Sequence, residues 1–333
     1  MLLLALVAMV LMAPASASAK SRYTVGIGDQ NPQLFSDPNF KSLNIKKVRV
    51  IVPWNWQAAT NDPAALDAYL TSAQIDNKQV LVAFSAPRGC YVNGKYSKKT
   101  SCKAPSQSRY KTAFKAFRAK YPQVKSFQPW NELNNASQPT YKSPKLAASY
   151  YKTLKGACKS CTVVAADILD TSNAISYVQK FMRYTRKQKP RLWGLHNYGD
   201  VNRFRTGSSS LTARFLKTVP GKVWLTETGG LVKFLPNFKK STSRAAKATK
   251  FMFTLADRFS KKRSGFRSTV ARLYPYTFYG YVVAPGQKNV APRFDAGLVG
   301  PLLFNKDYSL ATSSGSVRPS YTAFKTLVRS RSK

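Results

Sequence analysis

The segment KVRVIVPW (residues 47–54) is followed by a helical pattern at 63–76 and then by QVLVAFSA (residues 79–86). Both outer segments are apolar almost throughout, which is typical of parallel strands that are covered on their outer face. The helical pattern begins at Asp62-Pro63, and proline is well tolerated in the first turn of a helix. Residues 47–86 therefore predict a strand–helix–strand unit.

The same alternation continues along the whole chain. The eight predicted strands are residues 23–28, 47–54, 79–86, 124–132, 162–170, 191–199, 222–230 and 270–280. The predicted helices are residues 38–45, 63–76, 106–120, 144–157, 174–187, 209–218, 241–260 and 319–330. Eight such repeats predict one α/β domain, a (β/α)8 TIM barrel over residues 20–333, with an elaborated loop at 281–317. A doubly wound open sheet is the alternative, but no glycine-rich phosphate loop follows the first strand.

The N-terminal residues resemble a secretory signal peptide. The apolar run in MLLLALVAMVLMAPASASAK ends in small residues, and Ala17-Ser18-Ala19 fits a cleavage site before Lys20. The run is about twelve residues long, which is too short to span a bilayer comfortably. We therefore expect residues 1–19 to be a signal peptide and the remaining chain to be secreted.

Four cysteines are consistent with export to an oxidising compartment. Cys90 and Cys102 flank a polar loop, and Cys158 and Cys161 form CKSC. Four cysteines allow three pairings, of which we expect the local one, 90–102 and 158–161. A zinc site of four thiolates is the alternative, although the usual pair of CxxC units is missing.

The net charge of +41 is the second unusual feature of the composition. One interpretation is attraction to an anionic polymer or a charged cell wall; the other is a solvated surface in which Lys and Arg are simply abundant. In residues 106–120 the basic residues lie opposite an apolar helical stripe, which fits the second interpretation. No recognition-helix, RNA-binding or zinc-finger signature is present, so no specific nucleic-acid partner is expected.

Glutamate is rare, and both glutamates of the chain follow apolar runs. Glu132 ends the predicted strand at 124–132, and Glu227 lies near the end of the strand at 222–230. Strands four and seven face each other across a barrel mouth, where the active sites of such barrels lie. A pair of carboxyls roughly 5–5.5 Å apart performs retaining glycoside hydrolysis, whereas an inverting pair is roughly 6.5–9.5 Å apart. We therefore predict a catalytic pair.

The motifs WNE and TETG at these two strand ends resemble the pattern of glycoside hydrolase clan A, near families 5 and 39. The resemblance implies that Glu132 is the acid/base and Glu227 the nucleophile. Arg49 is similar to the arginine of strand two in these enzymes, and His196 and Tyr198 are similar to their His-x-Tyr on strand six. The tryptophan that strand eight usually carries is replaced here by Tyr and Phe.

Further candidates for substrate binding lie close to these motifs. Asn131 is expected to bind a sugar 2-hydroxyl, and Trp54, Trp130, Tyr276 and Phe278 are candidate stacking surfaces. Core packing is the plain structural interpretation of the two tryptophans, and a satisfied core histidine is that of His196.

The charged residues near the predicted strand ends each have two interpretations. Arg49 is either a cleft residue or the ion-pair partner of Asp29. Asp167 and Asp170 on strand five are either cleft residues or structural acids of the barrel.

These observations predict a secreted, monomeric, retaining glycoside hydrolase that cleaves a poly- or oligosaccharide and needs no metal or cofactor. A barrel that binds carbohydrate or cell wall through its basic surface, with little catalytic activity, is the alternative function.

Overall fold

The computed structural model describes residues 22–58, 63–87, 89–92, 95–283, 288–289, 292–305 and 315–332. The predicted signal peptide, residues 1–19, lies outside these ranges. None of the helices in the described ranges is both long enough and apolar enough to cross a membrane.

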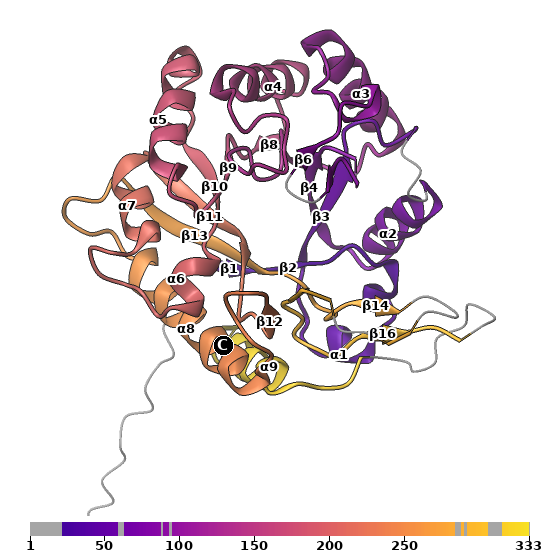
Figure 1. Cartoon of the computed structure of the whole chain (residues 1–333), viewed down its shortest axis with the longest axis vertical. Helices are drawn as coiled ribbons and strands as arrows, with labels where there is room; N and C mark the ends of the chain where they lie inside the picture. The colour runs from indigo at the N-terminus through magenta and orange to yellow at the C-terminus, as the bar shows by residue number, and fades with distance from the viewer. Residues whose placement is uncertain are drawn as a thin grey trace, which may run out of the picture.

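Two five-stranded parallel sheets form the centre of the molecule (Figure 1). In spatial order the first contains β1 (Thr24–Val25), β13 (Ser268–Pro275), β11 (Gly221–Thr228), β10 (Leu192–His196) and β9 (Asp167–Leu169). The second contains β2 (Ile27–Gly28), β3 (Lys47–Pro53), β4 (Gln79–Ser85), β7 (Ser126–Gln128) and β8 (Thr162–Val163). All eight predicted strands are present, two of them divided into short halves.

The divided strands connect the two sheets. Residues 24–28 pair with β13 through β1 and with β3 through β2, and the Gly26 N–H donates to the carbonyl of Leu273 (2.8 Å) between them. Residues 162–169 likewise pair with β7 through β8 and with β10 through β9. The parallel sheets therefore follow one another at both edges, as a barrel requires.

Helices surround the sheets on their outer side (Figure 1). The longer ones are α2 (Pro63–Ile75), α3 (Gln107–Lys120), α4 (Pro144–Ala157), α5 (Ala174–Tyr184), α7 (Leu211–Thr218), α8 (Thr242–Ser260) and α9 (Pro319–Ser332). Proline is the first residue of α2, α4 and α9, as the sequence predicts. In α3 the predicted apolar stripe is buried, and Ser106 caps the helix by accepting from the Arg109 N–H (3.3 Å).

Several strands end earlier than the sequence predicts. The predicted strand 124–132 ends at Gln128, because Pro129 has no N–H for the ladder, and Glu132 lies in the following turn. The predicted strand 191–199 ends at His196, and Tyr198 begins the short helix α6 (Tyr198–Asn202). The predicted strand 270–280 ends at Pro275.

Short strand pairs lie on the face where these strands end. β5 (Tyr91–Val92) pairs with β6 (Lys95–Tyr96) in the loop after β4, and β12 (Lys233–Phe234) pairs with β15 (Phe294–Asp295). The expected loop 281–317 thus contains β15, as well as β14 (Val282–Val283) and β16 (Leu302–Leu303). Asp295 is anchored by two contacts of 2.8 Å with the guanidinium of Arg318.

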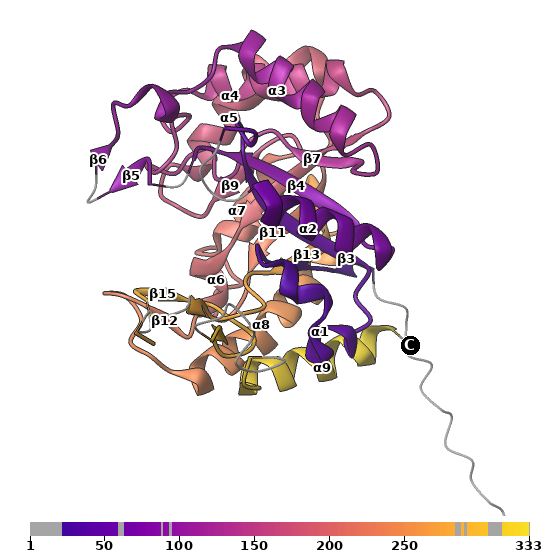
Figure 2. The ribbon, with the colours of Figure 1, turned by 90° about the vertical axis from the view of Figure 1, so that its right-hand side faces the viewer.

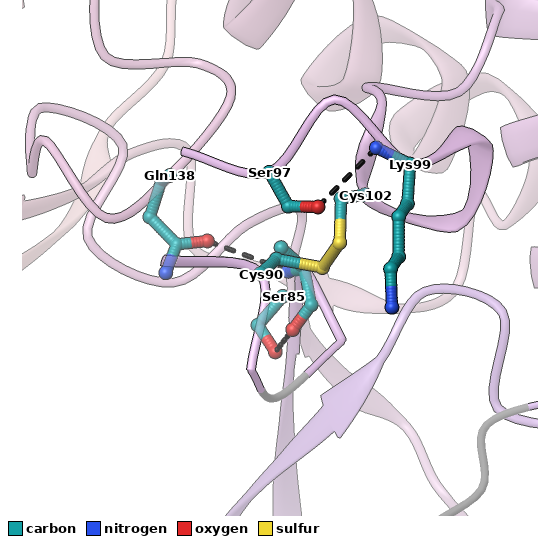
Figure 3. Close-up of a disulfide and its surroundings, with 7 residues drawn as sticks. Ser85, Cys90, Ser97, Lys99, Cys102 and Gln138 are labelled. Atoms are coloured by element: carbon teal, nitrogen blue, oxygen red, sulfur yellow. Dashed lines mark hydrogen bonds between the residues drawn. A yellow bond between two sulfur atoms is a disulfide. The ribbon is translucent and has the colours of Figure 1, made fainter. Parts of the chain in front are cut away.

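The structure contains the two local disulfides, Cys90–Cys102 and Cys158–Cys161. The first spans the loop that carries β5 and β6 (Figure 3). All four thiols are therefore engaged in disulfides and do not form a four-thiolate zinc site.

Candidate active site

Glu227 lies near the C-terminal end of β11. Its Oε1 accepts from Arg49 Nη1 (2.8 Å) and its Oε2 accepts from the hydroxyl of Tyr198 (3.3 Å). The side chain is 7% exposed. Both oxygens are thus held in a fixed orientation by donors from β3 and α6.

Glu132 approaches the same point from the turn after β7. Its backbone has φ = 46°, a left-handed conformation that a glutamate adopts only where the surrounding contacts impose it. Oε2 accepts from Asn135 Nδ2 (2.6 Å), and Oε1 lies 2.9 Å from His196 Nδ1. The side chain is 15% exposed, twice the fraction of Glu227, so Glu132 is the more accessible acid of the two.

The two glutamates and His196 each offer an atom to one small cluster. One carboxylate oxygen of Glu132, one of Glu227 and a ring nitrogen of His196 all lie within 4.8 Å of one another. This upper limit on the distance between the nearest oxygens is closer to the roughly 5–5.5 Å carboxyl pair of retaining glycosidases than to the roughly 6.5–9.5 Å of inverting pairs.

Arg49 connects the strands that contribute to the cluster. Its fully buried guanidinium donates to Gln128 Oε1 (2.7 Å), Glu227 Oε1 (2.8 Å), Asn131 Oδ1 (2.6 Å) and Asp167 Oδ2 (3.1 Å). A planar guanidinium with five N–H groups suits this arrangement, whereas a lysine offers a single ammonium. Asp29, the alternative partner from the sequence, accepts instead from the backbone N–H groups of residues 30, 31, 278 and 279.

Asp167 is the buried acid beneath the glutamates. Its Oδ2 lies 3.0 Å from His196 Nε2 and accepts from Arg49, while Oδ1 accepts from the Thr226 hydroxyl (2.5 Å). A Cβ at Gly194 would collide with Oδ1, so the glycine makes room for this carboxylate inside the sheets. Burial tends to raise the pKa of Asp167, but His196 and Arg49 together hold it well below its usual value.

His196 lies between three carboxyls, with Nε2 toward Asp167 and Nδ1 toward the two glutamates, 2.9 Å from Glu132 and 3.5 Å from Glu227. Burial alone lowers its pKa, but the attraction of Asp167 and Glu227 raises the pKa of His196 to about 10. The ring is therefore an imidazolium at neutral pH, with Nε2 facing Asp167 and Nδ1 facing the two glutamates.

Opposing influences also act on Glu227. Burial raises the pKa of Glu227, and the cations of His196 and Arg49 act in the opposite direction. Counted together, the cluster has three carboxyls, of Glu132, Asp167 and Glu227, and two cations. It is electrically balanced when one of the carboxyls holds a proton.

Glu132, Glu227 and His196 also have the ligand types and proximity that a metal ion needs. Arg49 and the imidazolium of His196 already supply two positive charges to these carboxylates. A divalent ion would have to displace the proton of His196 and face Arg49, so the donor set suits carboxylate chemistry better than metal binding.

Not every aromatic candidate from the sequence lies in the cleft. Trp130 and Phe278 are fully buried, with Trp130 stacked on Tyr150 (5.2 Å between centroids), so neither offers a face to a sugar. Trp54 is buried beneath the guanidinium of Arg109, which lies 5.3 Å from its ring. Tyr276 is partly exposed and lines a cavity beside Asn131.

Two contributors to the site are absent from the sequence-based candidates. Gln128 and Asn135 position Arg49 and Glu132. Asn135 follows Glu132 by three residues, a spacing that a turn brings together, and this is the one sequence signal that points to it.

The chain is similar to known proteins in its structure but not in its sequence. No protein-family model matches the chain, and no curated protein matches its sequence. Its structure is similar to a psychrophilic glycoside hydrolase family 10 endo-β-1,4-xylanase, at 9% identity over 91% of this chain and 96% of that chain, with a TM-score of 0.51.

Two further solved structures are similar. One is the N-terminal endo-1,4-β-D-xylanase 10B of Clostridium thermocellum complexed with xylohexaose, at 12% identity over 95% of this chain and 69% of that chain, TM-score 0.56. The other is a glucosidase from Croceicoccus marinus, at 15% identity over 92% and 67%, TM-score 0.56. The chain therefore has the parallel α/β fold of these TIM-barrel glycoside hydrolases.

Proposed function

We propose that the protein is a secreted, retaining glycoside hydrolase that cleaves O-glycosidic bonds of a poly- or oligosaccharide. In this proposal the two sheets close into a (β/α)8 barrel through residues 24–28 and 162–169, and residues 20–333 form one catalytic domain. The observation that supports it best is the approach of Glu132 and Glu227 within 4.8 Å, at the ends of the parallel strands.

The first step forms a bond between Glu227 and the sugar. The Glu227 carboxylate attacks the anomeric carbon while Glu132 gives its proton to the departing oxygen, so the glycosidic bond breaks as the glycosyl–enzyme bond forms. Arg49 and Tyr198 orient the attacking carboxylate. His196 and Asn135 stabilise the carboxylate that Glu132 becomes after losing its proton.

The second step reverses the roles. Glu132, now ionised, takes a proton from a water molecule, whose oxygen attacks the anomeric carbon and releases Glu227 as a carboxylate. Two inversions give net retention of configuration. Asn131, held by Arg49 at 2.6 Å, is proposed to bind the sugar 2-hydroxyl.

Isosteric variants test the proposal. Glu132→Gln and Glu227→Gln are expected to lose nearly all hydrolysis of a responsive aryl glycoside or polysaccharide. Asp67→Asn, at a surface acid paired with Lys120, is the matched control and is expected to retain full activity. Activity of both glutamine variants at the wild-type level would refute the assignment.

The second candidate function is a barrel that binds carbohydrate or cell wall, with the basic surface providing attachment. The net charge of +41 is the observation that favours it. The two functions separate in one assay: salt-sensitive binding to an anionic wall polymer, without cleavage of any glycan in a broad panel, supports this candidate over the enzyme.

A further inference from the structure

Two small ribbons flank the glutamate pair. The first ribbon is β5 and β6, which follow β4, and the second ribbon is β12 and β15. Figure 2 shows both projecting from the same side of the molecule, one above the other, with the ends of the central strands between them. A chain of sugars lying across the site would therefore pass from one ribbon toward the other.

Exposed aromatic side chains are concentrated on these ribbons. In the described residues the exposed large aromatic side chains are Tyr91 (36%), Tyr184 (45%), Phe204 (46%), Phe234 (39%) and Phe294 (36%). Three of these five lie on the two ribbons. Burying such rings against a ligand is favourable, and leaving them in water is costly, so their placement beside a catalytic pair points to ligand binding.

The second ribbon is connected to Glu227 through Tyr198. Tyr198, which donates to Glu227, makes an edge-to-face contact with Phe294 at 6.1 Å between ring centroids. Phe294 in turn meets Phe234 at 5.8 Å. The aromatic surface thus begins one side chain away from the carboxylate.

The first ribbon is connected to the other side of the site. Tyr91 lines a cavity of about 450 Å³ together with Asn131 and Tyr276, and Asn131 shares Arg49 with Glu227. The Cys90–Cys102 disulfide fixes this ribbon, and Gln138 accepts from the Ala86 N–H (3.4 Å) at its base (Figure 3). Tyr91 is therefore held at the rim of the cavity.

On the side of the first ribbon, the cavity walls lack the basic side chains that give the protein its net charge of +41. The described residues that line this cavity and its neighbour of about 460 Å³ include no lysine and no arginine, and their only acid is Asp29. Asp29 is buried and accepts from four backbone N–H groups. Gln30, Gln138 and Asn131 instead offer neutral amides, which suit hydroxyl groups better than carboxylates.

We propose that Tyr91 on one side, and Phe234 with Phe294 on the other, are sugar-binding subsites on opposite sides of the cleaved bond, so that the enzyme cuts inside an uncharged glycan chain. This proposal rests on the proposed hydrolase function. A chain held at both ribbons is cleaved internally, whereas an enzyme that removes terminal sugars has one side of its site closed.

The test uses end-labelled hexasaccharides of β-1,4-xylose, β-1,4-glucose, β-1,3-glucose, β-1,4-mannose and α-1,4-galacturonate, with products identified by mass spectrometry. The wild-type protein is expected to cut a neutral hexasaccharide internally. Tyr91→Ala and the double variant Phe234→Ala/Phe294→Ala are each expected to lower kcat/KM on it about tenfold and to move the cleavage position in opposite directions. The opposite shifts in cleavage position distinguish lost sugar contacts from a general loss of folded enzyme.

Tyr184→Ala is the matched control, because Tyr184 is at least as exposed as the ribbon aromatics but ends α5 away from the site. Three results would each overturn the proposal. The wild type releases only terminal monosaccharides, it prefers the galacturonate hexasaccharide, or the aromatic variants behave like this control. If the wild type cleaves nothing, binding of the same hexasaccharides by Glu227→Gln shows whether the subsites, the hydrolase function or both are wrong. Binding that is lost in the aromatic variants keeps the subsites and rejects the hydrolase, and no binding rejects both.

Discussion

Asp167 contacts both cations of the candidate site, Arg49 and His196, and it is fully buried. Asp167→Asn leaves these two cations without their shared carboxylate, which is costly because water cannot replace it. We expect a loss of about 3–5 kcal/mol in the free energy of unfolding, measured by urea denaturation at neutral pH. The exposed pair Asp67–Lys120 provides the control: Asp67→Asn is expected to cost less than about 1 kcal/mol. Equal losses in the two variants would contradict this role of Asp167.

The charge on His196 leads to a second prediction, which concerns how the free energy of unfolding changes with pH. The pKa of His196 rises from 6.5 to about 10 in the folded protein, so its contribution to stability is fully present below pH 6.5 and is lost as the pH rises toward 10. We therefore expect the stability difference between wild type and His196→Asn to be constant below pH 6.5 and to shrink between these two values. Denaturation series at several pH values measure it. A difference that grows with pH would show that the imidazole is not held as a cation.

At the scale of elements, the Cys90–Cys102 disulfide fixes the ribbon that carries Tyr91. It joins residues 12 apart, whereas Cys158 and Cys161 are 3 apart. Loop-closure entropy predicts a loss of about 3 kcal/mol for Cys90→Ser/Cys102→Ser and of about 2 kcal/mol for Cys158→Ser/Cys161→Ser. Thermal and chemical denaturation of the two double variants test this order, and the opposite order would contradict it.

The helices and strands also show which parts of the structure can be predicted from the sequence. Apolar runs and proline positions predict every central strand and the start of three helices, because burial and backbone chemistry are local properties. The two glutamates are predicted to lie at strand ends for the same reason. The sequence does not predict that Trp130 and Phe278 point into the core, since an aromatic side chain has the same chemistry in a core and in a cleft.

Other features depend on contacts that are distant in sequence. The second ribbon pairs residues 233–234 with 294–295, two strands too short to show any periodicity. The position of Asp167 depends on Gly194 in the neighbouring strand, and Glu132 reaches the site through a left-handed backbone conformation after Pro129. These are properties of the folded chain, and residue types alone do not determine them.

For the molecule as a whole, the charge and the cleft are expected to act independently. The surface of net charge +41 is expected to bind a polyuronate, with an affinity that falls steeply as salt rises, because bound counterions are released. Hydrolysis of a neutral oligosaccharide is expected to change little over the same range of salt. Titrations and rates at several salt concentrations test both. An equal loss of rate and binding would show that the basic surface takes part in substrate recognition.

The roles of the two glutamates are the central claim, and azide rescue tests them most directly. Glu227→Ala in the presence of azide is expected to give a glycosyl azide of inverted configuration, because azide occupies the space of the missing nucleophile. Glu132→Ala is expected to give a glycosyl azide of retained configuration, formed from the glycosyl enzyme on Glu227. The opposite pair of products would exchange the two roles, and the absence of rescue in both variants, with hydrolysis unchanged, would contradict the account.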